Sequence, residues 1–315
     1  MNGEVVIRPY REGDEVSINE GFNRTFGTRR ELAEWHWKYP AEPEGRWIML
    51  AVEAGGRVLA HYGAVASRFR CGEATVRAGQ ITDAYALPEV QGKKVFSECY
   101  EAFIQAFGRP GALPLMYGFP TVKHYHMGVT VLKYVPLGPV PLLRYQGGRL
   151  GVGLFERVRA GFDAAAVEDL WGRASARYRF GNVRDASWLG RRYAGRPGVS
   201  YVHLSVWRGG RPEAWGVVRE MGDRLVWVDL VWDGERERAL AVLARKVARR
   251  AVRRGVPAEL WLRGDAVAEA VLTRCGFRRH DGEAARAVAR SFEPVVDLDA
   301  IRTGWYVTAG DSDLV

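Results

Sequence analysis

The stretch that decides the fold is ITDAYALPEVQGKKVFS, residues 81–97. It reads as a strand, then a proline and a glycine-containing turn, then an amphipathic helix. Such a turn directs successive backbone N–H groups and the positive end of the helix dipole to one point, and Lys93 and Lys94 add charge beside it. The pattern therefore suits a pyrophosphate group. A single glycine is a weak signal, and an ordinary strand-to-helix loop with two solvated lysines explains the same residues.

Strand and helix patterns alternate on both sides of this stretch. The first half of the chain predicts strands at 5–9, 47–53, 58–69, 75–87 and 115–119, one more within 129–143, and helices at 15–26, 30–38 and 95–107. The second half predicts helices at 164–179, 184–194, 235–254 and 266–275 and strands at 200–207, 214–220, 225–232 and 258–262. The shared order of elements indicates an internal duplication.

This order predicts a fold of the α/β class (α+β in some schemes). Four glycines within residues 146–153 interrupt the pattern between the halves. We therefore expect two tandem domains, residues 1–147 and 148–315, each with a mixed central sheet flanked by helices. A length of 315 residues is sufficient for two such domains.

The composition is that of a globular protein, with 47% hydrophobic and 26% charged residues. No apolar run reaches the ~18–20 residues that span a bilayer, and the N-terminal residues do not resemble a signal peptide, so a cytoplasmic location is expected. The three cysteines, Cys71, Cys99 and Cys275, lie far apart and outside any histidine cluster. Neither a disulfide framework nor a metal site is predicted.

The net charge of +9 favours an anionic partner, and a molecule as small as a phosphorylated cofactor meets this description. Residues 245–254, RKVARRAVRR, carry cations at i, i+4 spacing opposite an apolar stripe, which is typical of a solvated helix face. A nucleic-acid footprint is the alternative, but aromatic interleaving and a known motif are both missing. Nucleic acid is therefore not an expected partner.

Five segments resemble the GNAT superfamily of acyl-CoA-dependent N-acyltransferases, in its bacterial two-domain form. They are VIRPYREGD at 6–14, WHWKY at 35–39, PEVQGK at 88–93, YGFP at 117–120 and WYVTAGDSD at 305–313. The resemblance covers most of residues 1–145 and the C-terminal segment, with a degenerate second copy between them. It implies two tandem GNAT-like domains.

The activity implied by the resemblance is acetyl transfer from acetyl-CoA to a primary amine of a small molecule, directly and within a ternary complex. An amino sugar, an aminoglycoside-like compound or an amino acid derivative is a plausible acceptor, and no metal is needed. One alternative is a degenerate GNAT-like binding or regulatory module, and another is a basic protein that acts on RNA or protein. No membrane partner is expected, and both a monomer and a homodimer stay open.

The resemblance also implies where the acyl-CoA binds. The pantetheine would pair with backbone groups of the strand before the loop, and the pyrophosphate would meet the loop itself. The cofactor-binding candidates are Ala84, Tyr85, Ala86, Gln91, Gly92, Lys93, Lys94, Val95, Phe96 and Ser97. The corresponding turn of the second copy, residues 231–237, contains carboxylates that repel phosphate, so only the first domain is expected to bind CoA.

The loop departs from the family pattern at two positions. Lys94 stands where the first loop glycine is expected, and Phe96 stands at the last position, where some two-domain members also have phenylalanine. If Lys94 has helical dihedral angles, its backbone N–H still binds phosphate. If the position requires a positive φ, a lysine costs roughly 1 kcal/mol or more and the anion site deforms.

The catalytic candidates are Asp83 and Tyr125. Asp83 precedes the cofactor-binding residues and would orient or deprotonate the amine, unless it is a structural residue that accepts backbone hydrogen bonds. Tyr125 follows the second cofactor strand, where family members often place the tyrosine that protonates the departing thiolate. A packing tyrosine is the alternative for Tyr125.

The substrate-binding candidates are His36, His124, Asp311 and Asp313. The chain partly resembles the enhanced-intracellular-survival type of acetyltransferase, in which the C-terminal carboxylate acts as base. We therefore expect the C-terminal segment to pack against the first domain, with its two acids facing a cationic acceptor. The alternative is that this segment only stabilises the interface between the two domains and has no catalytic role.

Overall fold

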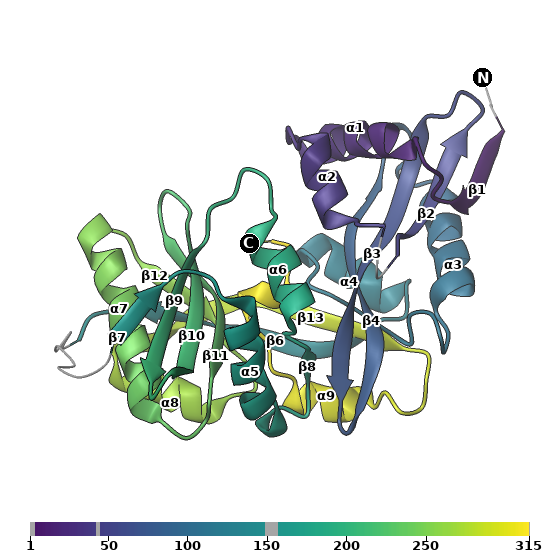
Figure 1. The fold of residues 1–315 in the computed structure, drawn as a ribbon. Coiled ribbons are helices and arrows are strands. Elements are labelled where there is room, and N and C mark those ends of the chain that lie inside the picture. The colour runs from purple at the N-terminus through teal and green to yellow at the C-terminus, as the bar shows by residue number, and fades with distance from the viewer. Residues whose placement is uncertain (1–3, 42–44, 149–156, 315) are drawn as a thin grey trace. The chain divides into compact units, whose positions relative to one another are not determined.

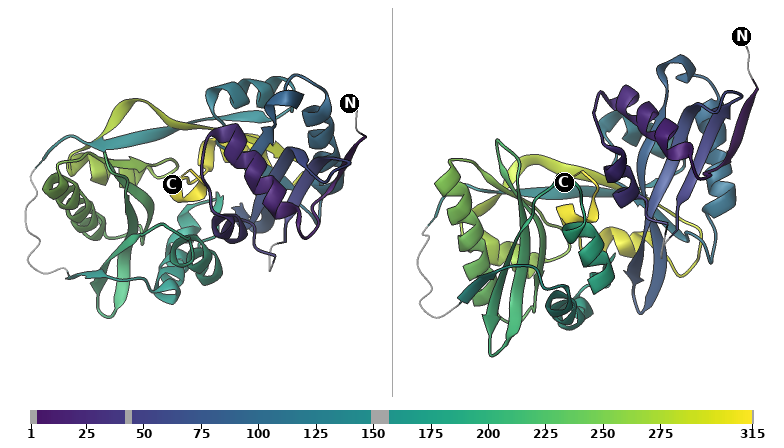
Figure 2. Two further views of the ribbon diagram at one scale, coloured as in Figure 1. Left: turned by 90° about the horizontal axis from the view of Figure 1, so that it is seen from above. Right: turned by 45° about the horizontal axis from the view of Figure 1, so that its top comes forward.

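The computed structural model describes residues 4–41, 45–148 and 157–314. The chain divides into two compact units. Unit 1 comprises residues 1–69, 75–137 and 287–298, and unit 2 comprises residues 70–74, 138–286 and 299–315. Each unit consists of strands of a mixed sheet with helices packed on them, which confirms the predicted α/β class (Figures 1 and 2).

Unit 1 has the strand order β1-β2-β3-β4-β5-β13. β1, β2 and β3 are antiparallel, β4 and β5 are parallel, and β5 and β13 are antiparallel. Its elements are β1 (Val5–Pro9), α1 (Asp14–Phe26), α2 (Leu32–Lys38), β2 (Trp47–Glu53), β3 (Val58–Cys71), β4 (Ala74–Ala86), α3 (Val95–Phe107), β5 (Leu115–Gly118) and α4 (Val122–Thr130).

Helices cover both faces of the sheet in unit 1, and β2 shows why. Successive side chains of a strand point to opposite faces. Ile48 and Leu50 therefore lie in the apolar cluster that contains Trp35 of α2, whereas Met49 lies in the cluster that contains Phe103 of α3. Strand β2 is thus buried on both sides, which explains its nearly continuous apolar sequence.

Unit 2 repeats the same plan with the strand order β6-β12-β11-β10-β9-β7. Its antiparallel strands β9, β10 and β11 lead to one parallel pair, β11 and β12, as β4 and β5 do in unit 1. Its further elements are β7 (Arg157–Ala160), α5 (Ala164–Ala174), β8 (Phe180–Asn182), α6 (Ala186–Ala194), β9 (Val202–Arg208), β10 (Arg211–Glu220), β11 (Leu225–Trp232), α7 (Glu237–Arg254), β12 (Ala258–Trp261), α8 (Ala266–Arg274) and α9 (Leu298–Gly304).

Two long strands have several residues in each unit, while β3 and β4 reach into unit 2 only with residues 70–71 and 74. β6 (Val135–Tyr145) begins in unit 1 and continues in unit 2, where its residues 142–144 pair with β12. β13 (Phe277–Ser291) begins in unit 2, and its residues 288–291 pair with β5 of unit 1. The compact units are therefore not identical to the halves 1–147 and 148–315, and the view that each half is one copy of a duplication stays a prediction.

β13 is also the one long strand that the sequence analysis misses. Most of its residues between Phe277 and Ala287 are charged or small, so no apolar alternation marks them. The signal is confined to its last residues, AVARS, of which Ala287, Val288 and Ala289 are buried. A strand whose burial comes only from distant partners has no local pattern to reveal it.

Candidate active site

The candidate site begins where β4 and β5 cease to pair. Their parallel register joins residues 78–80 of β4 to residues 115–117 of β5. β4 continues to Ala86, whereas β5 ends at Gly118. The last part of β4 therefore extends beyond its ladder with β5, and its residues include the predicted pantetheine partners.

Tyr85 and Ala84 face opposite sides of β4. Ala84 is half-buried and packs against the cluster that contains α3, whereas Ala86, also half-buried, contacts both this cluster and the one that contains Tyr85. Tyr85 is buried on the other side, where its ring stacks on His61 at 5.6 Å and its hydroxyl donates to the Ile18 carbonyl at 3.0 Å. Only the backbone of Tyr85 is thus available to a ligand on the α3 side, and the pairing of pantetheine with this backbone stays a prediction.

The loop after β4 resolves the question raised by Lys94. The left-handed conformation falls on Gly92, with φ +78°, whereas Lys94 has φ −65° and ψ −16° and is the N-cap of α3. Lys94 is therefore unstrained. The side-chain amide of Gln91 donates to the Ala86 carbonyl at 3.2 Å and ties the loop to the end of β4.

The N-terminus of α3 presents free backbone donors. No side chain caps this 13-residue helix among the described residues, and the Ser97 hydroxyl donates to the Lys94 carbonyl instead. The first N–H groups of a helix have no partner within the helix. The N–H groups of Val95, Phe96 and Ser97 therefore point outward at the positive end of the dipole, where an anion is stabilised.

Asp83 lies inside the unit and is held by two cations. Its carboxylate contacts the Arg30 guanidinium at 2.5 Å and the Lys38 ammonium at 2.6 Å, and its side chain is 2% exposed. Burial alone would raise the pKa of Asp83, but the charges of Lys38 and Arg30 outweigh it and hold the pKa below its ordinary value. Its φ of +53° is unusual for a residue with a side chain.

His61 of β3 lies beside Asp83, and the sequence analysis does not identify it. Its Nδ1 lies 2.8 Å from the Asp83 carbonyl, so the neutral ring carries its proton there. Burial lowers the pKa of His61 to about 4, although the charge of Asp83 opposes this. Its buried Nε2 has no hydrogen-bond partner within the described structure.

The remaining unit 1 candidates lie on two short helices. Tyr125 is half-buried in α4 and packs against the cluster that contains α3. His124 is also half-buried, and its Nδ1 lies 3.1 Å from the Thr121 hydroxyl. His36 is exposed on α2, with its ring edge-on to Trp35. The catalytic and substrate-binding roles given to these residues stay predictions.

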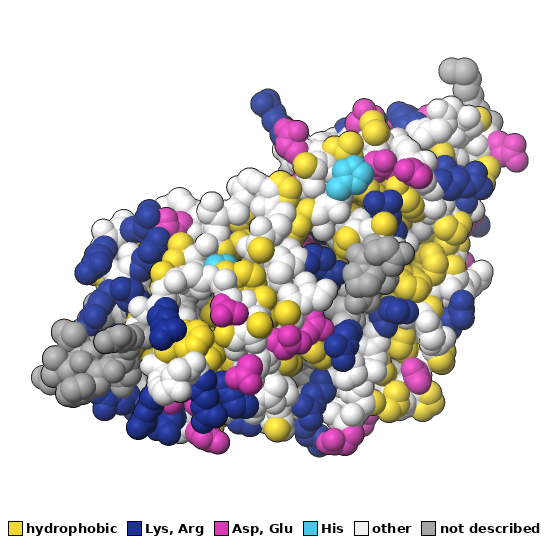
Figure 3. All heavy atoms as spheres, viewed as in Figure 1, with side chains coloured by type: hydrophobic (Ala, Val, Ile, Leu, Met, Phe, Trp, Pro, Cys, Tyr) yellow, Lys and Arg dark blue, Asp and Glu magenta, His cyan; other side chains and the backbone are white. Residues whose placement is uncertain are grey.

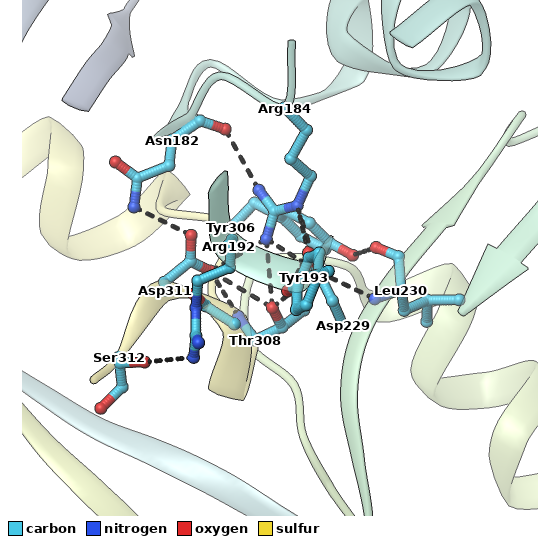
Figure 4. A network of polar contacts seen from close by, with 11 residues as sticks. Asn182, Arg184, Arg192, Tyr193, Asp229, Leu230, Tyr306, Thr308, Asp311 and Ser312 are labelled. Carbon is cyan, nitrogen blue, oxygen red and sulfur yellow. Dashed lines mark hydrogen bonds and ion pairs between the residues drawn. The ribbon is translucent and has the colours of Figure 1, made fainter. Parts of the chain in front are cut away.

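The C-terminal segment differs from expectation, because residues 299–315 belong to unit 2 rather than to unit 1. Asp311 is 2% exposed and pairs with the Arg184 guanidinium at 3.0 Å, within the polar network of Figure 4. Asn182 also donates to Asp311, at 2.9 Å. Asp311 is therefore satisfied inside unit 2, a placement that does not favour contact with an acceptor. Asp313 is half-exposed, and its role stays a prediction.

The basic helix α7 carries ion pairs on its exposed face. Arg250 and Arg254 both contact Glu220, at 2.7 Å and 2.6 Å. Figure 3 shows Lys and Arg side chains spread over the face drawn, with acidic side chains among them. These pairs fit the interpretation of a solvated helix face.

Comparisons with known proteins agree with this geometry. Residues 6–127 match the family model described as an acetyltransferase (GNAT) domain. A probable N-acyltransferase from Enterococcus faecalis has a similar structure, with TM-score 0.72 and 10% identity over 91% of this chain and 72% of that one. A GCN5-related N-acetyltransferase from Kribbella flavida gives 0.66 and 16%, over 92% and 71%. No curated protein matches the sequence.

N-myristoyltransferase from Saccharomyces cerevisiae, solved with bound myristoyl-CoA, is also similar, with TM-score 0.62 and 8% identity over 100% of this chain and 90% of that one. At these low sequence identities, structural similarity is evidence for the fold alone. The evidence for the family is the match of residues 6–127 to the family model. Residues 6–127 are therefore a domain of the GNAT family. This domain extends from β1 to α4, and its loop of residues 91–97 leads into the N-terminus of α3.

Two features are absent from the described residues. No group of three or more His, Cys, Asp or Glu side chains in that part of the chain is placed to hold a metal ion. Among the same residues, none of the helices combines the length and apolar character needed to cross a membrane.

Proposed function

We propose that unit 1 is an acyl-CoA-dependent N-acyltransferase that transfers an acetyl group from acetyl-CoA to a primary amine of a small molecule. The observation that carries the proposal is the loop of residues 91–97. Its one left-handed residue is a glycine, and it leads into a helix whose N-terminus no described side chain caps. Family membership supplies the donor class.

The pyrophosphate would accept hydrogen bonds from the N–H groups at the start of α3, with Lys93 and Lys94 adding positive charge. The pantetheine would lie along Ala84–Ala86, beyond the β4–β5 ladder. Gly92 suits this placement, because nothing lies within 4 Å of the position that its Cβ would occupy. The backbone can therefore be approached closely there.

In the transfer itself, the neutral amine attacks the thioester carbonyl carbon, a C–N bond forms and the C–S bond breaks. The amine loses one proton and the departing thiolate takes up one, so the products are an amide and free CoA. Tyr125 is the proposed proton donor to the thiolate. Asp83, held by Lys38 and Arg30 with a lowered pKa, is suited to positioning rather than to accepting a proton.

The loop placement is tested by Gly92→Glu, with Gly111→Glu as the matched control. Both glycines have positive φ, +78° and +80°, and open space at the Cβ position, so the backbone cost is the same. The carboxylate at position 92 should repel the pyrophosphate and raise the Kd for acetyl-CoA at least tenfold, about 1.4 kcal/mol.

Calorimetric titration with acetyl-CoA measures this change. The Gly111→Glu variant should bind as the unchanged protein does. Equal affinity of both variants would refute the loop placement, and no binding of acetyl-CoA by the unchanged protein would refute the enzyme. Binding without CoA release from any amine would instead favour the non-catalytic alternative.

A further inference from the structure

The two units contain matching sets of three charged residues and one tyrosine on equivalent elements. In each, an arginine stands two residues before the second helix, a cation follows eight residues later, a tyrosine comes next, and an aspartate lies on the strand that precedes the long helix. The members are Arg30, Lys38, Tyr39 and Asp83 in unit 1 and Arg184, Arg192, Tyr193 and Asp229 in unit 2. In both units the arginine is ion-paired with the aspartate.

In unit 2 a peptide segment completes the set (Figure 4). The Nη2 of Arg184 donates to the Asp311 carboxylate at 3.0 Å and to the Thr308 hydroxyl at 3.1 Å. The Nη2 of Arg192 donates to the Ser312 carbonyl at 2.8 Å. Arg184 thus binds two carboxylates, one on its own sheet and one brought by the C-terminal segment.

In unit 1, among the residues that the structure describes, the equivalent arginine pairs with only the first of these carboxylates. Arg30 donates through Nη1 to Asp83 and through Nε to the Asn19 side chain at 2.7 Å. Its Nη2 is buried and has no hydrogen-bond partner in the described structure, although the guanidinium stacks over the Phe22 ring. The Arg30 side chain is 6% exposed. A buried, unpaired donor on a charged group is costly, so its retention indicates a partner that arrives from outside.

We propose that unit 1 binds the carboxylate of its acceptor at Arg30 Nη2, as Arg184 Nη2 binds Asp311. The acceptor is then a small molecule that carries both a primary amine and a carboxylate, as amino acids do. A carboxylate matches the guanidinium fork in charge and shape. This inference rests on the proposed function and narrows its acceptor.

The position of the cluster agrees with that role. Asp83 immediately precedes Ala84–Ala86, the backbone proposed to hold the pantetheine of acetyl-CoA. The ion pair with Asp83 therefore places the Arg30 guanidinium beside this part of β4. The Lys38 side chain is 11% exposed, so the group formed by Arg30, Lys38 and Asp83 is in contact with solvent at Lys38. The inference also reverses the expectation of a cationic acceptor, since Asp311, one of the two acids on which that expectation relied, is buried in unit 2.

The experiment compares matched acceptors on the unchanged protein. CoA release from acetyl-CoA is measured with the twenty amino acids, with their carboxamides and with glucosamine, and melting temperatures of the CoA-bound protein are measured with the same compounds. At least one amino acid should show a kcat/KM ten times that of its amide, and should raise the melting temperature where its amide does not.

The variant Arg30→Lys keeps the charge beside Asp83 but removes the Nη2 donor. It should raise the KM for that amino acid at least tenfold and leave the KM for acetyl-CoA within twofold, whereas Arg109→Lys, at an exposed arginine, should change neither. If acetyl-CoA binds but the amides or glucosamine serve as well as the acids, or no acid stabilises the protein, the inference is overturned while the proposed function stands. The wild-type comparison decides this even if Arg30→Lys fails to fold.

Discussion

Arg290 of β13 donates a hydrogen bond to the backbone carbonyl of Leu132, 3.1 Å away, across 158 residues of chain. The same guanidinium nitrogen donates to the Tyr100 hydroxyl, which itself donates to the Leu132 carbonyl. All three residues belong to unit 1. A strand from the far end of the sequence therefore joins α3 to the segment after α4.

Arg290→Met should lower the free energy of unfolding of unit 1 by about 1–3 kcal/mol, because it leaves buried acceptors without their charged donor. Arg286→Met on the same strand is the control, since that side chain is 49% exposed and its ion pair is with nearby Glu283. Denaturant unfolding followed by tryptophan fluorescence measures both. Equal losses would show that the Arg290 contacts contribute nothing specific.

A fragment of residues 1–147 should not melt cooperatively, because it lacks the strand that pairs with β5. Residues 288–291 of β13 form that pairing, and Val288 is buried in the same cluster as Phe103. Thermal melting followed by circular dichroism compares the fragment with the whole chain. A sharp transition in the fragment, together with acetyl-CoA binding, would contradict this expectation.

The stability of unit 1 should fall as the pH decreases from about 6.5 to 4. Burial lowers the pKa of His61 to about 4, so the unfolded chain takes up this proton first and the stability present above pH 6.5 is lost as the pH falls. Asp83, Arg30 and Lys38 are the charges that face the ring. The lowered pKa of Asp83 keeps that carboxylate ionised over the same range.

The measurement is the free energy of unfolding at pH 7 and 4.5 for the wild type and His61→Asn, whose amide can keep the hydrogen bond to the Asp83 carbonyl. The wild type should lose about 2–3 kcal/mol more than the variant between the two pH values. His126→Asn, at an exposed histidine of α4, should keep the wild-type dependence. A wild-type profile in His61→Asn would rule out this source.

Tyr125→Phe should lower kcat for acetyl transfer by roughly tenfold to a hundredfold with little change in melting temperature, if its hydroxyl protonates the thiolate. The ring is half-buried and its packing is unchanged by the substitution. Steady-state CoA release gives kcat and KM separately. Full activity in the variant would assign Tyr125 to packing alone.

Asp311→Ala should destabilise unit 2 by about 3–5 kcal/mol, because it leaves the fully buried Arg184 with one carboxylate instead of two. Asp313→Ala, at a half-exposed residue, should cost far less. Denaturant unfolding compares the two. A loss of acetyl transfer in Asp311→Ala without loss of stability would restore the acceptor-binding role.

The sequence was sufficient for the loop but not for its surroundings. A strand, a proline, a glycine and an amphipathic helix are local signals, so the path of residues 81–97 could be predicted, whereas the dihedral angles of Lys94 could not. The partners of Asp83 lie 53 and 45 residues away, and only folding brings them together. One signal was available, since the spacing between Arg30 and Lys38 is repeated between Arg184 and Arg192.

The exchange of β6 and β13 between the units has a consequence for protein synthesis. A nascent chain emerges from its N-terminus, and most tandem domains fold one after the other. Here the sheet of unit 1 lacks its β13 strand until the ribosome has passed Ser291, and unit 2 lacks the carboxylate of Asp311 until twenty residues later. The sheet of unit 1 therefore stays incomplete through most of translation, and the two units complete their folding at almost the same time.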